Sequence, residues 1–102
     1  MSPAHANDEG LIQVPHIAEP CGHAKEIGPV QASGTGCKEC LEMSDRWVHL
    51  RLCMTCGQVG CCDNSRNKHA TKHYHETGHP IIRSFEPGEA WLYCYPDEAV
   101  IR

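Results

Sequence analysis

Two C-x-x-C pairs constrain this chain more than any other feature of its sequence. The first pair is Cys37 and Cys40, and the second is Cys53 and Cys56. This spacing lets a tight turn bring two thiolates to one point, where a tetrahedral zinc ion needs two further ligands. The sequence that follows offers a supply of them: Cys61, Cys62, His69, His73, His75 and His79. Two pairs with this supply predict two zinc sites rather than a redox-active dithiol.

The length and the N-terminal sequence decide between metal binding and disulfide bonding. The chain has 102 residues, with 8 Cys and 8 His. At this length we expect one small domain, and small domains often depend on disulfides or metals because their cores are small. The N-terminal residues show neither the basic region nor the apolar stretch of a secretory signal peptide. We therefore expect a cytoplasmic protein whose cysteines bind metal.

The charge of the chain limits the kinds of partner. The formal net charge is −4 at pH 7. An acidic chain lacks the basic surface that phosphate binding requires, so nucleic-acid binding is disfavoured. No apolar run approaches the length that a membrane-spanning helix needs. We expect a monomer that binds a protein or a peptide, and neither nucleic acid nor membrane.

The chain is expected to divide at residue 20. Residues 1–20 form a largely flexible N-terminal segment with one short strand at 11–14, and residues 21–102 form the domain. Residues 21–40 are rich in Gly and Pro and are predicted to be mostly loop. Strands are predicted over residues 46–52, 80–86 and 90–95. A helix is predicted over residues 65–77, capped by Asn64 or Ser65 and ended by Gly78 and Pro80.

Helix geometry separates the histidines from one another. His69 and His73 are four residues apart and lie on one face, about 40° apart around the helix axis. His75 lies roughly 200° around from His73 and is expected to face solvent.

Residues 75–79 read H-E-T-G-H and match the zinc-protease motif H-E-x-x-H. A working motif needs both histidines in one helix. Here Gly78 interrupts the last turn, and Pro80 directs His79 out of the helical conformation. These features favour a structural role in zinc binding for His69, His73 and His79. A small metalloenzyme that uses His75 and Glu76 is the alternative. A thiol-based redox or zinc-responsive protein is a further alternative.

The order of the motifs is specific. Along the chain they read Cys37-x-x-Cys40, Cys53-x-x-Cys56-Gly-Gln-Val-Gly-Cys61, His69-Ala-x-x-His73, Gly78-His79 and Ala90-Trp91. This order resembles the UBP-type zinc finger, a module of ubiquitin-specific proteases, of a histone deacetylase and of stand-alone small proteins. The resemblance extends from Cys21 to about Tyr95. It implies an α+β fold, a small zinc-stabilised domain with a twisted antiparallel sheet of about three to five strands and one or two helices.

The resemblance also implies how the ligands are shared between two zinc ions. The first site is implied to contain Cys37, Cys40, Cys61 and His69. The second is implied to contain Cys53, Cys56, His73 and His79. Cys62 is then a neighbour of the first site, although spacing alone leaves open that it replaces Cys61.

A third zinc occurs in some members of the family. Its ligands there are an early C-x-H and a late C-x-x-C. This chain has Cys21 and His23 at the early position, but Cys94 and Asp97 at the late one. A carboxylate is a regular zinc ligand, so these four residues can form a third site. The alternative is that Cys94 is simply buried and Cys21 has no metal.

In much of the family, the finger binds the free C-terminal Gly-Gly tail of ubiquitin between aromatic side chains. The resemblance implies that Trp91 and Tyr93 form the aromatic pair, with Trp47 as a further wall. Asp63 stands where an arginine is usual, and a carboxylate there would repel the tail. Arg51 stands where an aromatic residue is usual, and we hypothesise that it supplies the missing cation. The favoured function is a non-catalytic module that recognises a peptide tail, and core packing is the alternative role for the aromatic pair.

Overall fold

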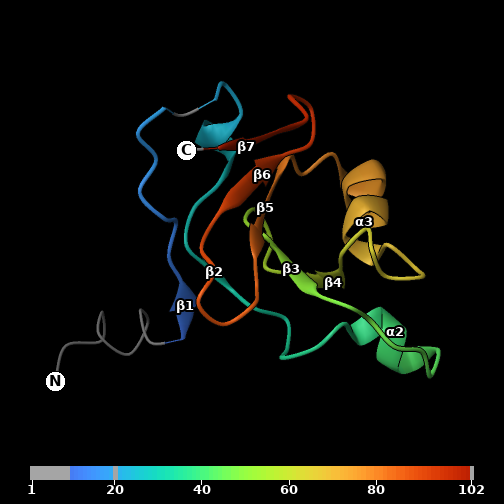
Figure 1. The fold of residues 1–102 in the computed structure, drawn as a ribbon. Coiled ribbons are helices and arrows are strands. Elements are labelled where there is room, and N and C mark those ends of the chain that lie inside the picture. The colour runs from blue at the N-terminus through green and yellow to red at the C-terminus, as the bar shows by residue number, and fades with distance from the viewer. Residues whose placement is uncertain (1–9, 20, 102) are drawn as a thin grey trace, which may run out of the picture.

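The computed structural model of the chain describes residues 10–19 and 21–101 (Figure 1). The strands are β1 (Leu11–Ile12), β2 (Val30–Gln31), β3 (Leu50–Cys53), β4 (Val59–Cys61), β5 (Ile81–Ser84), β6 (Leu92–Cys94) and β7 (Ala99–Ile101). The helices are the short 3-10 helix η1 (Ala24–Glu26) and the α-helices α2 (Lys38–Glu42) and α3 (His69–Thr77). Two α-helices beside antiparallel sheets confirm the predicted α+β class. Within the described residues, none of the helices has the length and apolar character that crossing a bilayer requires.

The main sheet has five antiparallel strands in the order β4-β3-β5-β6-β7. Strand β3 pairs with β4 on one side, where Leu52 lies opposite Val59, and with β5 on the other, where Leu52 lies opposite Arg83. Helix α3 connects β4 to β5 and packs against β4 and β3 (Figure 1). The sheet therefore has helices at its β4 end, and β7 forms its opposite edge.

The core contains sulfur as well as hydrocarbon. Its largest fully buried apolar side chains are Leu52, Met54, Val59, Ile81 and Leu92. Four thiols with 0 % exposure lie in the same cluster, those of Cys37, Cys40, Cys61 and Cys94. Packing of the core and binding of metal by these thiols therefore depend on one another.

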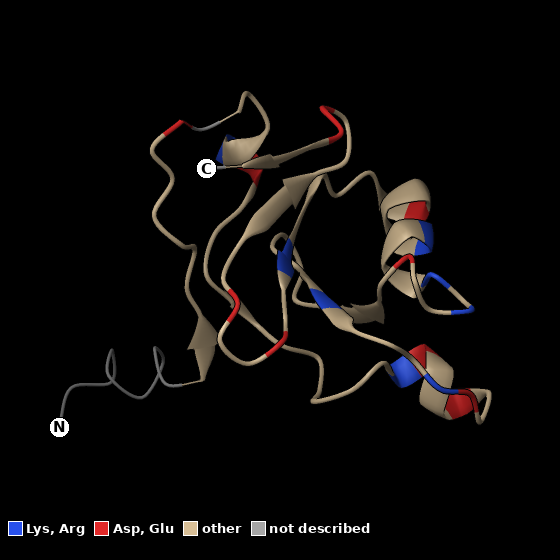
Figure 2. Ribbon diagram, in the orientation of Figure 1, with Lys and Arg blue, Asp and Glu red and all other residues tan. Residues whose placement is uncertain are grey.

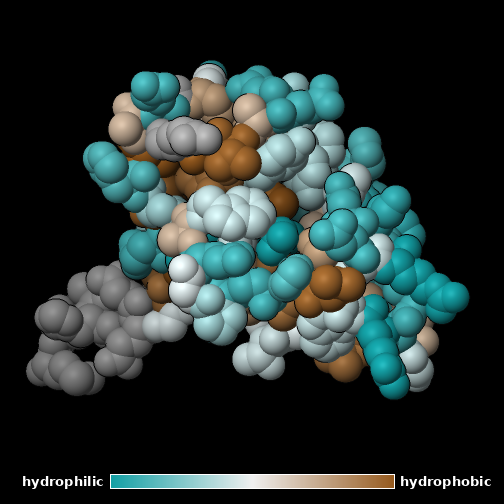
Figure 3. Space-filling model, viewed as in Figure 1, coloured by the Kyte–Doolittle hydropathy of each residue, from teal (hydrophilic) through white to brown (hydrophobic). Residues whose placement is uncertain are grey.

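The N-terminal part of the described chain lies against the domain. We call residues 10–19 and 21–27 the strap. Strand β1 pairs with β2, and Ile12, Val14 and Ile17 pack against the core. Figure 3 shows brown, hydrophobic atoms in the upper left of the view, where the strap meets β7. The predicted flexible segment falls in part on residues 1–9, which lie outside the described residues.

Two predicted elements begin later than the sequence suggested. The strand predicted from residue 46 begins at Leu50, because the N–H of Val48 donates to the Ser65 hydroxyl (2.7 Å) instead of joining the ladder. The helix predicted from residue 65 begins at His69. Lys68 has a left-handed backbone (φ 50°), which an α-helix cannot contain, and Ser65 is buried with its hydroxyl bonded to Val48 rather than capping the helix.

Five elements were not predicted from the sequence: η1, β2, α2, β4 and β7. Helix α2 lies at the end of the predicted loop, and the Cys37 sulfur caps it by accepting from the N–H of Cys40 (3.4 Å). Strands β4 and β7 each have only three residues, too few to show an alternating pattern. Their positions are set by pairing with β3 and β6.

We predict that Gly57→Ala destabilises the fold strongly. Gly57 has a φ of +86°, and a Cβ there would lie 2.0 Å from the carbonyl oxygen of Gln31. The alanine would incur about 1–2 kcal/mol of left-handed strain plus the cost of moving β2 away. Thermal unfolding at fixed zinc concentration measures the effect.

The matched control is Gly88→Ala. Gly88 has a similar φ of +81°, but nothing lies within 4 Å of the added Cβ. This variant should lose only the stability that the backbone strain costs. Equal losses of thermal stability in the two variants would contradict the role given to the contact with Gln31.

Candidate metal centres and an adjoining pocket

The first group of metal-binding side chains lies inside the core. Cys37 and Cys40 come from the start of α2, Cys61 from the end of β4 and His69 from the start of α3. The three thiols are 0 % exposed and the histidine is 6 % exposed. These residues, which the resemblance implied as one site, are brought together by the structure; we call them the first centre.

The separations in the first centre fit a single tetrahedral zinc ion. Two sulfurs bound to one zinc are about 3.8 Å apart, and a sulfur and a nitrogen about 3.5 Å. The Cys40 and Cys61 sulfurs are 3.8 Å apart. Nδ1 of His69 lies 3.2, 3.3 and 3.6 Å from the sulfurs of Cys37, Cys40 and Cys61. The four donors therefore surround a common point at the spacing that zinc requires.

Hydrogen-bond donors around the first centre face its sulfurs. The N–H of His69 donates to the Cys61 sulfur (3.1 Å). The amide of Asn67 lies 3.7 Å from the Cys40 sulfur and also donates to the Asp45 carboxylate (2.8 Å). Such contacts orient the ligands and stabilise negative charge on sulfur.

The raised pKa of a thiol in the first centre also indicates that a cation binds there. Burial, together with the neighbouring thiols of Cys37 and Cys61, raises the pKa of the Cys40 thiol to about 12. Without a cation, the Cys40 thiol would keep its proton, and the Asn67 amide beside it would face neutral sulfur. A zinc ion makes the thiolate form stable, so the residues present fit this metal.

The second group contains Cys53, Cys56, His73 and His79, again as the resemblance implied. The sulfur of Cys53 is 3.5 Å from Nδ1 of His79, and the sulfur of Cys56 is 3.4 Å from Nε2 of His73. The two imidazole nitrogens are 3.3 Å apart, which matches about 3.3 Å for two nitrogens on one zinc. Burial and the neighbouring His79 lower the pKa of His73, which favours the neutral imidazole that binds metal. We call this group the second centre.

The end of α3 delivers His79 to the second centre. Gly78 follows the helix with a left-handed backbone (φ 76°), so His79 lies beyond the helix rather than on it. The Thr77 hydroxyl accepts from the N–H of His79 (3.1 Å) and donates to the His73 carbonyl (2.7 Å). His69 and His73, one turn apart on α3, thus serve different centres.

The H-E-T-G-H stretch does not form a single metal site. His75 and Glu76 are exposed, and His75 packs its ring beside Tyr74 at 5.2 Å. His79 belongs to the second centre, whereas His75 is in none of the groups found among the described residues. The two histidines of the motif are therefore separated, as the helix geometry predicted.

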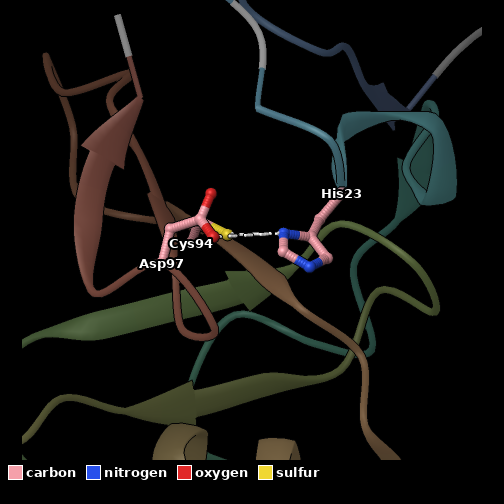
Figure 4. Close-up of polar contacts among 3 residues, drawn as sticks. All are labelled: His23, Cys94 and Asp97. Carbon is pink, nitrogen blue, oxygen red and sulfur yellow. Dashed lines mark hydrogen bonds and ion pairs between the residues drawn. The ribbon is translucent and has the colours of Figure 1, made fainter.

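The third group joins two distant parts of the chain (Figure 4). Cys21 and His23 come from the strap, and Cys94 and Asp97 from the β6–β7 hairpin. Nδ1 of His23 lies 3.4 Å from the Cys94 sulfur and 3.6 Å from a carboxylate oxygen of Asp97. The side chains of His23 and Asp97 are 35 % and 44 % exposed. The donor set fits zinc, and it is more open to solvent than the first centre; we call it the third centre.

Cys62 lies outside all three groups. Its sulfur is 3.6 Å from the Ser65 hydroxyl, and it lines a separate pocket. Burial alone raises the pKa of this thiol, but hydrogen bonds to Ser65 and to the backbone of Asn64 and His49 outweigh it and lower the pKa. The arrangement places Cys61, not Cys62, among the donors of the first centre.

A pocket of about 320 Å³ opens beside the sheet, next to the first centre. It is lined by Arg51, Cys62, Asp63, Asn64, Ile82, Trp91, Tyr93, Tyr95 and Val100. The guanidinium carbon of Arg51 lies 4.6 Å from the centroid of the Trp91 ring, a cation–π contact. Figure 2 shows β3, which carries Arg51, as one of the few charged stretches within a largely uncharged sheet. We call this the aromatic pocket.

Further aromatic rings support the wall of the aromatic pocket. Tyr95 stacks on Tyr74 at 4.6 Å and meets Tyr93 edge-on at 5.3 Å. Burial raises the pKa of Tyr95 to about 12, so its hydroxyl keeps its proton at neutral pH. Tyr95 was not predicted from the sequence. The alternation of Trp91, Tyr93 and Tyr95 was the signal that could have revealed it.

Trp47 lies elsewhere. It lines a different pocket with Asp45 and Arg46, and its ring packs against Gly36, where an added Cβ would lie 2.9 Å from it. The aromatic pocket therefore contains three of the four residues proposed for the ligand, namely Arg51, Trp91 and Tyr93, but not Trp47.

Comparisons with known proteins agree with this geometry. Residues 37–102 match the family described as "Zn-finger in ubiquitin-hydrolases and other protein". The solution structure of protein RPA1320 from Rhodopseudomonas palustris is similar, with a TM-score of 0.77 and 52% sequence identity over 83% of each chain. The match to the family covers more than half of the chain and includes every donor of the first and second centres.

Two curated relatives are much longer proteins. The NAD-dependent deacetylase sir2A of Dictyostelium discoideum is 41% identical over 59 residues. Ubiquitin carboxyl-terminal hydrolase 14 of Schizosaccharomyces pombe is 37% identical over 68 residues. Each match covers 58% of this chain but only 10% and 8% of the respective relative. The similarity is thus to one module within them, and the chain belongs to the UBP-type zinc-finger family as a zinc-binding domain.

Proposed function

We propose that this domain is a non-catalytic module that holds structural zinc in the first and second centres and binds the free C-terminal tail of a partner polypeptide in the aromatic pocket. The observation that carries the proposal is Arg51, which is held over Trp91 inside a pocket walled by tyrosines. The name of one relative, ubiquitin carboxyl-terminal hydrolase 14, makes ubiquitin or a ubiquitin-like protein the first partner to test.

The state of Arg51 suits the binding of a carboxylate. One N–H of its guanidinium donates to the Leu50 carbonyl (3.0 Å), and the ring of Trp91 fixes its plane. Within residues 10–19 and 21–101, the ion pairs do not include Arg51, so its charge has no protein carboxylate as partner. An arginine with free donors in a partly enclosed pocket binds a terminal carboxylate favourably.

The walls of the aromatic pocket suit a tail without side chains. Trp91, Tyr93 and Tyr95 present flat rings, and a Gly-Gly segment can lie between such rings without a clash. The protonated hydroxyl of Tyr95 is a further donor at the pocket. The volume of about 320 Å³ is at the small end for ligand pockets, which fits two or three tail residues rather than a folded surface.

The zinc centres support a structural role rather than catalysis. Each of the three groups already contains four side-chain donors. Structural zinc sites are closed in this way, whereas a catalytic zinc keeps one position for water or substrate. The exposed His75 and Glu76 have no place in these groups.

We predict that the variants Cys61→Ser and Cys62→Ser differ sharply in zinc content and in folding. Loss of Cys61 removes a 0 %-exposed donor of the first centre, so this variant should lose one zinc equivalent and its compact fold. Cys62→Ser should keep the zinc content of the wild type. Metal analysis with amide NMR spectra measures both, and zinc loss in the Cys62 variant alone would reverse the assignment.

A peptide ending in a free Gly-Gly should bind the zinc-loaded protein and shift the Trp91 indole resonance. Amidation of its C-terminus should abolish binding, because Arg51 then has no carboxylate to pair with. Trp91→Ala should weaken binding at least about tenfold, as expected for an aromatic anchor. Trp47→Ala is the control and should bind normally; equal losses in both variants, or no response to amidation, would overturn the proposal.

Asp63→Asn should strengthen tail binding. Asp63 lines the aromatic pocket and accepts a hydrogen bond from Thr71, yet its charge still opposes that of a tail carboxylate. A gain of roughly two- to fivefold is expected, and it should shrink at high salt because the site is exposed. Glu42→Gln, an exposed change on α2 away from this pocket, should have no effect in the same titration.

A further inference from the structure

One hairpin carries both the wall of the aromatic pocket and half of the third centre. On β6, Tyr93 lines the pocket and the next residue, Cys94, belongs to the third centre. Tyr93 pairs with Val100 of β7, which also lines the pocket. The turn between the strands contains Asp97, the fourth donor. Any movement of this hairpin therefore changes both sites together.

Strand β6 of the hairpin is fixed by β5, with which Leu92, Tyr93 and Cys94 all pair, but β7 has fewer partners. Strand β7 is the edge of the sheet and pairs only with β6, and its residues Ala99 and Val100 are exposed. Within the described residues, the polar contacts between the hairpin and the strap include those of His23 with Cys94 and Asp97 and that of Cys21 with Cys94. The strap itself is anchored further along, where Glu26 accepts from the Thr55 hydroxyl and Gly28 donates to Met54. The third centre thus links the anchored strap to β6 at Cys94 and, through Asp97, to the turn that leads into the β7 edge.

The third centre differs from the other two in its donors and from the first centre in its exposure. One of its four donors is a carboxylate, and the other two groups contain only sulfur and nitrogen. The first centre is enclosed by the core, whereas His23 and Asp97 are more than one-third exposed. The donors Cys21 and His23 also lie outside the region that matches the family, residues 37–102. A carboxylate in place of a nitrogen or sulfur donor, and easier access for water than in the first centre, both favour weaker, exchangeable binding.

We propose that the third centre is an exchangeable zinc site, weaker than the other two, whose occupancy controls tail binding in the aromatic pocket by fixing the β6–β7 hairpin. The second half of this proposal rests on the proposed tail-binding function. When the four donors share a metal, Cys94 and Asp97 are tied to the strap, and Val100 on β7 is held beside Tyr93 at the pocket wall. When they do not, the β7 edge is free to move and Val100 is less well ordered against Tyr93. By linkage, tail binding strengthens metal binding at the third centre by the same factor.

The test compares Asp97→Asn with Glu98→Gln in the full chain. Asp97 is a donor, whereas Glu98 is its exposed neighbour and belongs to none of the groups. Zinc is added to saturation and counted by native mass spectrometry, and the affinity for a free Gly-Gly peptide is measured on the same samples. Wild type and Glu98→Gln should bind a third equivalent. Asp97→Asn should bind two and should lose about fivefold or more in peptide affinity.

His23→Gln is the second variant, because it removes a donor from the strap side and leaves the hairpin sequence intact. His23→Gln should lose both the third zinc equivalent and the same share of peptide affinity as Asp97→Asn. Failure of wild type to bind a third equivalent, or retention of it by both donor variants, overturns the third centre. Loss of the third zinc with unchanged peptide affinity and unchanged amide resonances of Tyr93 and Val100 overturns the link.

A separate readout distinguishes failure of this proposal from failure of the proposed function. A graded chelator should remove the third zinc from wild type first, without peptide present. The amides of Tyr93 and Val100 and the indole of Trp91 should then shift or broaden while α3 stays unchanged. If wild type binds no Gly-Gly peptide, the tail function fails. Unchanged hairpin resonances between the two-zinc and three-zinc forms then overturn the link, and shifted ones support it.

Discussion

The first centre is the interaction on which the rest of the structure depends. It joins α2, β4 and α3 through side chains that are almost completely buried. Thiolates in such a place are unstable without a counter-charge, and the raised pKa of Cys40 expresses that cost in the absence of a cation. A bound zinc ion removes this cost and at the same time fixes three elements in position. The metal therefore does for this small chain what a larger apolar core does for a larger domain.

The aromatic pocket depends on the same frame. Arg51 comes from β3, which lies inside the sheet, and Asp63 follows β4 two residues after Cys61, a donor of the first centre. The resemblance implied a cation at position 63 and an aromatic residue at position 51, and this chain has an acidic residue at the first position and a cation at the second. Arg51 and Asp63 line the same pocket. In the proposed function, the pocket therefore still offers a cation to a ligand, but the cation comes from β3 instead of from the segment after β4.

The resemblance implied the α+β class, and hydrophobic alternation and helix-capping residues predicted the order of three main strands and the long helix, because these are local signals. The resemblance also implied the three groupings of donors that the structure shows. Local signals did not predict the features of the fold that depend on tertiary contacts. Ser65 satisfies a backbone N–H of Val48 instead of capping α3, and β4 and β7 exist only because neighbours pair with them. Trp47 could not be placed, since its distance from the aromatic pocket depends on how the loop before β3 packs against Gly36.

The alternation of donors along the chain has a consequence for assembly. The cysteines of the second centre lie between the donors of the first, and α3 supplies one histidine to each. Neither centre is built from a contiguous segment, and neither is complete until α3 has formed, because this helix carries a donor for each. Assembly of the two centres is therefore coupled through one helix: zinc bound at either centre favours the helix that the other centre also requires.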